Sequence, residues 1–212
     1  MNKHFAEFVE IFAPQVDRAT PPSDQLDNLK KRLPNALIDF WTTAGWSGYA
    51  DGLLWSTNPE EFAPALDAWL GQTSLAKQDE YSVVARSAFG KLFLWGRNSG
   101  MSVIINPHMA SVTTIENSFS PDRADNHISA FFLSKSKDYF DFDDANDKPL
   151  FSRALRKLGP LKGDEMYAFA PACGLGGIPK LDNLIVEKIV PHLVFLAQLS
   201  EIEFRHLNVR RK

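Results

Sequence analysis

Apolar residues near the start of the chain recur three or four positions apart, at Phe5, Phe8, Val9 and Phe12. This spacing places them on one face of a helix, and Pro14 marks the point where that helix is expected to end. We therefore expect the chain to open with an amphipathic helix whose phenylalanines face a core.

The pattern up to residue 45 predicts a loop followed by two helices. Residues 17–24 are polar and contain two adjacent prolines, which is typical of a loop. Ser23 is placed to cap a short helix, and Pro34 suits the first turn of a second helix that ends before Gly45. The apolar positions of this second helix are Leu37, Phe40 and Trp41.

Short apolar runs replace the helical pattern in the middle of the chain and predict strands. They cover residues 52–57, 81–88, 91–96 and 101–106. Glycine-containing turns join the last three runs, which is typical of an antiparallel meander. Between the first two runs, residues 59–70 predict a helix, and its inward positions are Leu66, Trp69 and Leu70.

Helical patterns return towards the C-terminus. The tripeptide Ser120-Pro121-Asp122 predicts the start of a helix. Its apolar positions are Ile128, Phe131, Phe132 and Leu133. Residues 148–158 predict a further amphipathic helix. A last helix follows, which Pro191 either kinks or starts, and a break near Val190 is favoured. Strands in the middle with helices at both ends predict an α+β fold with a central antiparallel sheet meander.

The composition of the 212 residues is typical of a globular protein that can bury a core, with 44% hydrophobic residues. The longest apolar runs are short and interrupted by polar residues, so no membrane segment is expected. Acidic residues in the first helix argue against a signal peptide, and the single cysteine, Cys173, fits a cytoplasmic location. A formal charge of −3 argues against a chain whose main task is to coat nucleic acid.

A glycine-rich segment between residues 165 and 180 is the nearest match to a ligand-binding motif. It predicts a strand, a turn with Gly174, Gly176 and Gly177, and then a helix, which is the order of a nucleotide phosphate loop. The segment lacks the third glycine of a dinucleotide fingerprint, and no Ser or Thr follows Lys180 as a Walker loop requires. We interpret Gly176 and Gly177 as a structural turn, with a nucleotide site as the alternative.

No residue pattern indicates a catalytic or metal centre. The five histidines are scattered without a cysteine or carboxylate at a metal-ligand spacing, so neither a metal nor a cofactor is expected. Cys173 with His192 as its base is one reading, but a free cysteine is more often a buried small side chain. Core packing is favoured over stacking on bases or sugars for the aromatic residues Trp41, Trp46, Tyr49, Trp55, Trp69 and Trp95.

An acidic segment places five aspartates within residues 138–147, with Phe140 and Phe142 between them. Alternation of this kind makes one side acidic and the other apolar. A solvated loop is one interpretation. The other is a surface for a basic partner, because dense carboxylates speed encounter and can occupy a site built for phosphates. A calcium loop is disfavoured because the glycine and terminal glutamate of an EF-hand are missing.

Motifs in both halves of the chain resemble a known pair of bacterial domains. The first half resembles the GAD-like domain at Met1-Asn-x-His-Phe, Gly45-Trp-x-Gly-Tyr-Ala-Asp-Gly-Leu, Pro64-x-Leu-Asp-Ala-Trp-Leu-Gly and Ala85-Arg-Ser-Ala-Phe-Gly-x-Leu-x-Leu-Trp-Gly96. The second half resembles the domain that commonly follows it, at Tyr139-Phe-Asp-Phe-Asp-Asp, Lys148-Pro-Leu-Phe, Leu158-Gly-Pro-Leu, Asp164-Glu-Met-Tyr, Gly176-Gly and Leu196-Ala-Gln-Leu. The resemblance implies a GAD-like domain over residues 1–115 and an immunity-type domain over residues 116–212, packed together as one unit.

Proteins with this pairing are similar to immunity proteins of type VI secretion systems, which bind and silence DNase toxins encoded beside them. The resemblance implies a non-enzymatic, cytoplasmic protein whose partner is a cognate nuclease. Direct nucleic-acid binding and a membrane partner are not expected, and the oligomeric state stays open. A nuclease presents a basic cleft to DNA, so an acidic surface is favoured. The residues expected at the toxin interface are Asp138, Tyr139, Phe140, Asp141, Asp143 and Asp144.

Two other functions remain as alternatives. A DNA-binding regulator of its own operon would use the basic tail of residues 205–212, and an enzyme would hold a nucleotide at residues 174–180.

Overall fold

A sheet of eight strands crosses the computed structural model, which describes residues 1–199 and 201–208. Seven of the strands lie beside their chain neighbours and pair antiparallel, whereas β10 arrives from the C-terminal part and pairs parallel with β7. The strands are β1 Gln15–Ala19, β2 Trp46–Tyr49, β3 Leu54–Ser56, β4 Tyr81–Ser87, β5 Leu92–Gly96, β6 Gly100–Asn106, β7 Ser111–Glu116 and β10 Glu203–Asn208.

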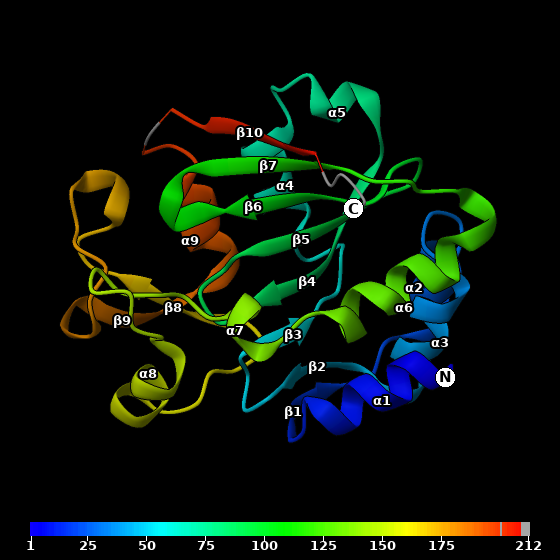
Figure 1. Cartoon of the computed structure of the whole chain (residues 1–212), viewed down its shortest axis with the longest axis horizontal. Helices are drawn as coiled ribbons and strands as arrows, with labels where there is room; N and C mark the ends of the chain where they lie inside the picture. Colours follow the sequence, from blue (N-terminus) through cyan, green and yellow to red (C-terminus); the bar gives the residue numbers. More distant parts are fainter. Residues whose placement is uncertain (200, 209–212) are drawn as a thin grey trace.

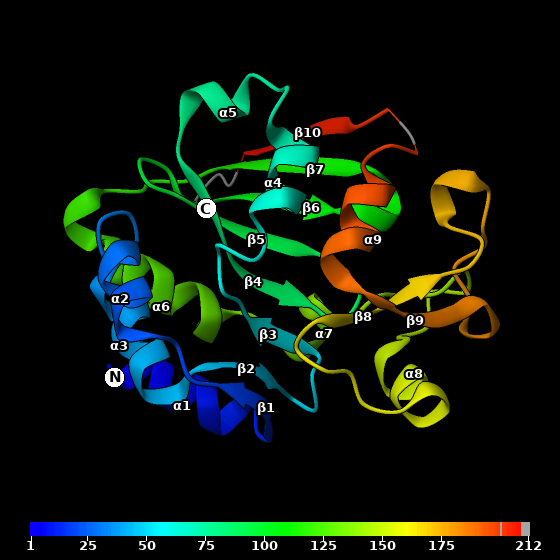
Figure 2. The ribbon, with the colours of Figure 1, turned by 180° about the vertical axis from the view of Figure 1, so that it is seen from behind.

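Helices cover both faces of this sheet. Figure 1 shows α6 in front of the strands, where it packs on β6 and contacts α1 and α3, and Figure 2 shows α4 and α9 on the other face. The helices are α1 Lys3–Ile11, α2 Ser23–Leu29, α3 Asn35–Ala44, α4 Ala63–Leu70, α5 Leu75–Gln78, α6 Ala124–Ser134, α7 Lys137–Phe140, α8 Phe151–Leu158 and α9 Ile189–Leu196. Four 3₁₀ turns are η1 Pro107–Met109, η2 Pro121–Arg123, η3 Cys173–Leu175 and η4 Leu181–Asn183.

Both faces of the central strands are buried, which explains why these strands read as continuous apolar runs. In β5, Phe93 and Trp95 face the core shared with α1, α3 and α6, whereas Leu92 and Leu94 face the core shared with α4 and α9. The interpretation of the aromatic residues as core is confirmed, since all six are buried.

A second, two-stranded sheet lies at one end of the molecule. It consists of β8 (Glu165–Phe169) and β9 (Leu184–Lys188), which pair antiparallel. The amide of Tyr167 donates to the carbonyl of Ala88 at 2.9 Å and so ties β8 to the turn that follows β4. Both views place this sheet and α8 at the end opposite α1, α2 and α3 (Figure 1, Figure 2).

The α+β class with a central antiparallel meander is confirmed. The predicted loop at residues 17–24 is wrong in part, because β1 runs to Ala19 and α2 already begins at Ser23. Ser23 lies inside that helix and makes no capping bond. The side chains of β1 are mostly exposed, so backbone pairing with β2 forms the strand without a hydrophobic pattern.

Three predicted helices begin later in the structure than in the sequence pattern. The helix predicted from residue 59 begins at Ala63, and that predicted from residue 148 begins at Phe151. Ser120 bonds the side chain of Asp122 instead of capping a helix, and the turn η2 precedes the start of α6 at Ala124. In each of the three cases, a polar residue followed by a proline precedes the helix and does not form its first turn.

The predicted order of strand, glycine turn and helix is wrong. The glycines are followed by η4 and by β9, and α9 begins only at Ile189. The favoured break near Val190 is wrong, because Pro191 lies within the first turn of α9, where a proline is tolerated.

Candidate functional site

The acidic segment of residues 138–147 forms a hydrogen-bonded loop between α6 and α8. It starts in α7 and ends in a turn that an isolated bridge between Asp143 and Pro149 closes. The amide of Asp144 donates to the carbonyl of Lys148 at 2.9 Å across this turn. The backbone therefore fixes which aspartates face solvent.

Asp144 points into the loop. Its carboxylate lies 2.7 Å from the Arg153 guanidinium and accepts the amides of Asn146 at 2.8 Å and Lys148 at 3.2 Å. The hydrogen bond from Arg153, followed by these amides, holds the pKa of Asp144 below its usual range. The side chain is buried, so in the free protein Asp144 closes the turn.

Asp141 is half-buried and organises the start of α8. Its carboxylate accepts the amides of Phe142 at 2.6 Å and Phe151 at 2.9 Å, the second being the first residue of that helix. Burial raises the pKa of Asp141, and these amide bonds oppose the rise. Burial also lowers the pKa of the nearby Lys91 ammonium, an effect that the charges of Asp141 and Asp143 reduce.

The aromatic residues of the segment anchor it to the sheet. Phe140 is fully buried, with its ring 5.4 Å from that of Phe93 and 5.7 Å from that of Phe12. Tyr139 is half-buried beside Phe93, and the ammonium of Lys135 lies 4.7 Å from its ring centre. Phe140 therefore belongs to the core, while Tyr139 keeps part of its ring at the surface.

Two of the six predicted interface residues, Asp138 and Asp143, are exposed, and Asp147 adds a third exposed aspartate. Within the described residues none of the three forms an ion pair. The structure thus brings the six predicted residues onto one loop but leaves only part of them free for a partner. Nothing in the pattern D-Y-F-D-F-D-D distinguishes the buried carboxylates from the exposed ones.

The glycine turn lies directly beside the acidic segment. The amide of Ala145 donates to the carbonyl of Pro179 at 2.8 Å, which joins the two. Gly176 has a φ of +84°, and the amide of Gly177 donates to the carbonyl of Ala172 at 3.0 Å. Because η3 and η4 are single 3₁₀ turns and β9 follows them, the segment lacks the helix start on which a phosphate loop depends.

His108 is buried, and its side chain packs between the acidic segment and β8. Its ring packs edge-on against Phe142 of the acidic segment at 5.6 Å and Phe169 of β8 at 4.9 Å. Both ring nitrogens lack a hydrogen-bond partner among the described residues. Burial, and then the charge of His192, lower the pKa of His108 to about 3.

We expect acid to destabilise the protein through His108. Because the folded-state pKa lies below the unfolded value of about 6.5, the unfolded chain takes up the proton first, and stability is lost as the pH falls below that value. Between pH 7 and pH 5 this loss amounts to about 2 kcal/mol. Urea unfolding at both pH values should show a shallower pH dependence in His108→Leu than in the wild type. His206→Leu on the exposed strand β10 is the control, and equal dependence in all three proteins would contradict the assignment.

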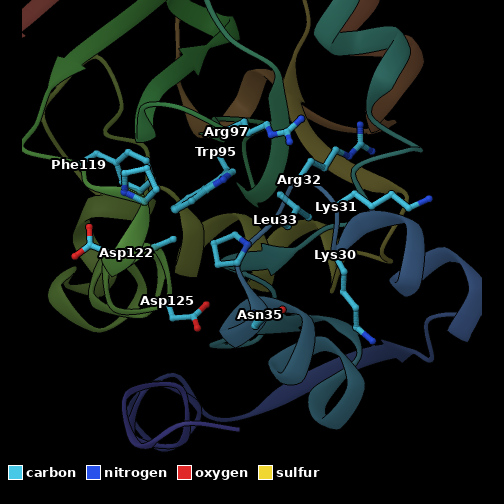
Figure 3. A pocket seen from close by; sticks show the side chains of 13 residues that line it. Lys30, Lys31, Arg32, Leu33, Asn35, Trp95, Arg97, Phe119, Asp122 and Asp125 are labelled. Carbon is cyan, nitrogen blue, oxygen red and sulfur yellow. The ribbon is translucent and has the colours of Figure 1, made fainter.

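A hollow of about 280 Å³ lies between the α2–α3 connection, the end of β5 and η2. Figure 3 shows the cations Lys30, Lys31, Arg32 and Arg97 on one side of it and Asp122 and Asp125 on the other. Arg32 and Arg97 both approach Glu80, at 3.7 and 3.5 Å. This hollow was not among the sites expected from the sequence, although three basic residues in a row at 30–32 could have indicated it. Lys30 also lies 2.9 Å from Asp27, so three of the four cations already have a carboxylate close by, which makes the hollow a weak candidate for an anion site.

The remaining candidates for chemistry gain no support from the geometry. Burial raises the pKa of the Cys173 thiol, and within the described residues it forms no hydrogen bond with His192. The described residues contain no group of three side chains that could hold a metal ion, and none of their helices is long and apolar enough to span a membrane. Arg205 of the basic tail is paired with Glu203 at 2.6 Å, and residues 209–212 lie outside the described residues.

Comparisons with known proteins identify the family of the chain and a shared fold. The model of the GAD-like domain matches residues 3–109, and the model of the C-terminal domain of the type VI secretion system immunity protein Tdi1 matches residues 125–200. The crystal structure of Atu4351 from Agrobacterium tumefaciens superposes with a TM-score of 0.86 at 21% identity, over 100% of this chain and 94% of that one, which shows a shared fold. No curated protein sequence matches the chain. The chain therefore belongs to the GAD-like family and carries the C-terminal domain of a type VI secretion system immunity protein.

Proposed function

We propose that this chain is an immunity protein that binds a nuclease effector of a type VI secretion system and keeps it from cleaving DNA in the cytoplasm. The match of residues 125–200 to an immunity-protein domain carries this proposal, because it supports an immunity role directly. To this match the proposal adds two points: the target is a nuclease, and the mechanism is tight binding.

The exposed carboxylates suit a nuclease as the target. A nuclease has to present positive charge to phosphates, and a carboxylate surface competes for the same charge. Neutralising even a few toxin molecules requires nanomolar affinity or better, about −12 kcal/mol, and an interface of about 800 Å² or more on each partner. Such an interface needs no catalytic group of its own.

Within the acidic segment, we assign direct contact with the toxin to the exposed side chains. Asp138 and Asp143 point to solvent, and the surface part of Tyr139 offers an aromatic contact beside them. Asp141 and Asp144 act indirectly, because their carboxylates hold the loop in shape. Phe140 anchors the loop in the core.

Reversing the exposed charges tests this division. We expect Asp138→Lys combined with Asp143→Lys to weaken toxin binding by about 30-fold, since two favourable contacts become repulsive. Binding is measured by calorimetry with a catalytically inactive form of the nuclease, and protection by growth of cells that co-express the active form.

The matched control is Glu7→Lys combined with Glu10→Lys, which makes the same change in charge on the exposed face of α1. This control should bind as the wild type does. Equal affinity of the acidic-segment variant and the wild type would remove Asp138 and Asp143 from the interface.

A further inference from the structure

A second surface feature lies next to the acidic segment, on the face of β9 that packs towards α9. It is a groove of about 430 Å³. Its floor and walls are mainly apolar, and they include Pro171, Leu175, Ile185, Pro191, His192 and Phe195. Three separate parts of the chain therefore form the groove: the loop after β8, strand β9 and helix α9.

Large apolar side chains are unusually exposed in and around this groove. Leu175 is 60% exposed and Phe195 is 45% exposed. Ile178, on the turn that carries Leu175, is 56% exposed. Contiguous exposed apolar surface with a polar rim is typical of a protein-binding site, because leaving it in water is unfavourable.

Charge at the rim indicates which partner fits. Glu187 and Lys188 both lie in the groove lining, and the Lys188 ammonium is paired with Asp164 at 2.6 Å. The bond from Ala145 to Pro179 brings the exposed Asp143 and Asp147 next to the turn that carries Leu175. An apolar centre with carboxylates at one edge complements a surface that presents apolar side chains flanked by Lys and Arg. A nuclease that binds DNA has such basic flanks.

From this arrangement we infer that the groove is the apolar centre of the toxin interface, and that it takes up hydrophobic side chains of the nuclease while the acidic segment pairs with its cations. The inference rests on the proposed function and deepens it. It adds Leu175 and Phe195 as anchors, because a few well-packed, desolvated side chains near the centre of an interface carry most of the binding free energy.

The test compares two double variants, each of which removes one leucine and one phenylalanine side chain, but from different surfaces. Leu175→Ser with Phe195→Ser empties the groove. Leu207→Ser with Phe204→Ser, on strand β10, is the control, since these residues are 53% and 52% exposed. The affinity of each purified chain for the inactive nuclease is measured by calorimetry, with circular dichroism to verify folding.

We expect the groove variant to bind at least about 30-fold more weakly than the wild type and the control to bind within about threefold of it. If the groove variant fails to fold, Leu175→Ser alone, on an exposed turn, replaces it and should weaken binding at least fivefold, or roughly 1 kcal/mol.

The outcomes separate the two proposals. A wild-type chain that does not bind the nuclease overturns the proposed function and the inference with it. A wild-type chain that binds, together with a groove variant of equal affinity, overturns the inference alone. A free chain that is dimeric in gel filtration, and becomes monomeric in the groove variant, would instead assign the groove to a second copy.

Discussion

Replacing Arg86 by alanine should lower the free energy of unfolding by about 4 kcal/mol, because the change opens a cavity and leaves buried carbonyl groups without a donor. Arg86 lies on β4 and is fully buried. Its guanidinium donates to the carbonyls of Gly163 at 2.8 Å and Ser87 at 3.3 Å, and it stacks 4.5 Å from the ring centre of Trp55. The side chain thus joins the GAD-like sheet to the loop before β8.

Thermal unfolding followed by circular dichroism measures this effect. For a chain of this size, the expected loss corresponds to a melting temperature about 12 °C lower. Arg97→Ala is the control, since Arg97 is exposed and its ion pair with Glu80 is long at 3.5 Å; its effect should stay within about 0.5 kcal/mol. A melting temperature of Arg86→Ala close to that of the wild type would show that Arg86 does not join the two parts.

Gly177→Ala should destabilise the glycine turn by about 3 kcal/mol or more, because a Cβ atom at this position has no room. It would overlap the carbonyl oxygen of Pro171 and lie 2.7 Å from its carbonyl carbon and 2.9 Å from the oxygen of Ala172. These are backbone atoms, which cannot rotate away as a flexible side chain can. The turn carries Leu175, so the same change should also disturb the groove.

The neighbouring Gly176→Ala variant separates crowding from backbone strain. Gly176 has a φ of +84° but open space around its Cα, so alanine there should cost only about 1 kcal/mol. Chemical denaturation of both variants gives the comparison. Equal stability of the Gly177 variant and the wild type would show that the backbone of this turn can move to make room for a Cβ atom.

The central meander could be predicted from the sequence because its strands are buried on both faces. Their apolar runs end at turns that contain glycine, such as Gly90 between β4 and β5, with a φ of +74°. The strands β1 and β10 left no such pattern, since nearly all of their side chains are exposed, and backbone pairing with a few polar side-chain contacts holds them in the sheet. Strand β9 was missed because its residues 184–188 run directly into the apolar start of α9.

The candidate site could be predicted only in part, and for a different reason. The sequence located the acidic segment, but the roles of its aspartates depend on which backbone amides and side chains the fold brings to each carboxylate. Asp141, for example, accepts the amide of Phe151, ten residues further on. The groove could not be found at all, because Leu175, Ile185 and Phe195 come together only through the fold of the loop after β8, β9 and α9.

The most direct test of the account is a titration of nuclease activity. The purified active nuclease is held at a fixed concentration, and cleavage of a DNA duplex is followed as the intact chain is added. We expect cleavage to fall in proportion to the added protein and to stop near equal amounts of the two proteins, as tight one-to-one binding requires. Cleavage that continues unchanged at a large molar excess of the chain would contradict the central claim.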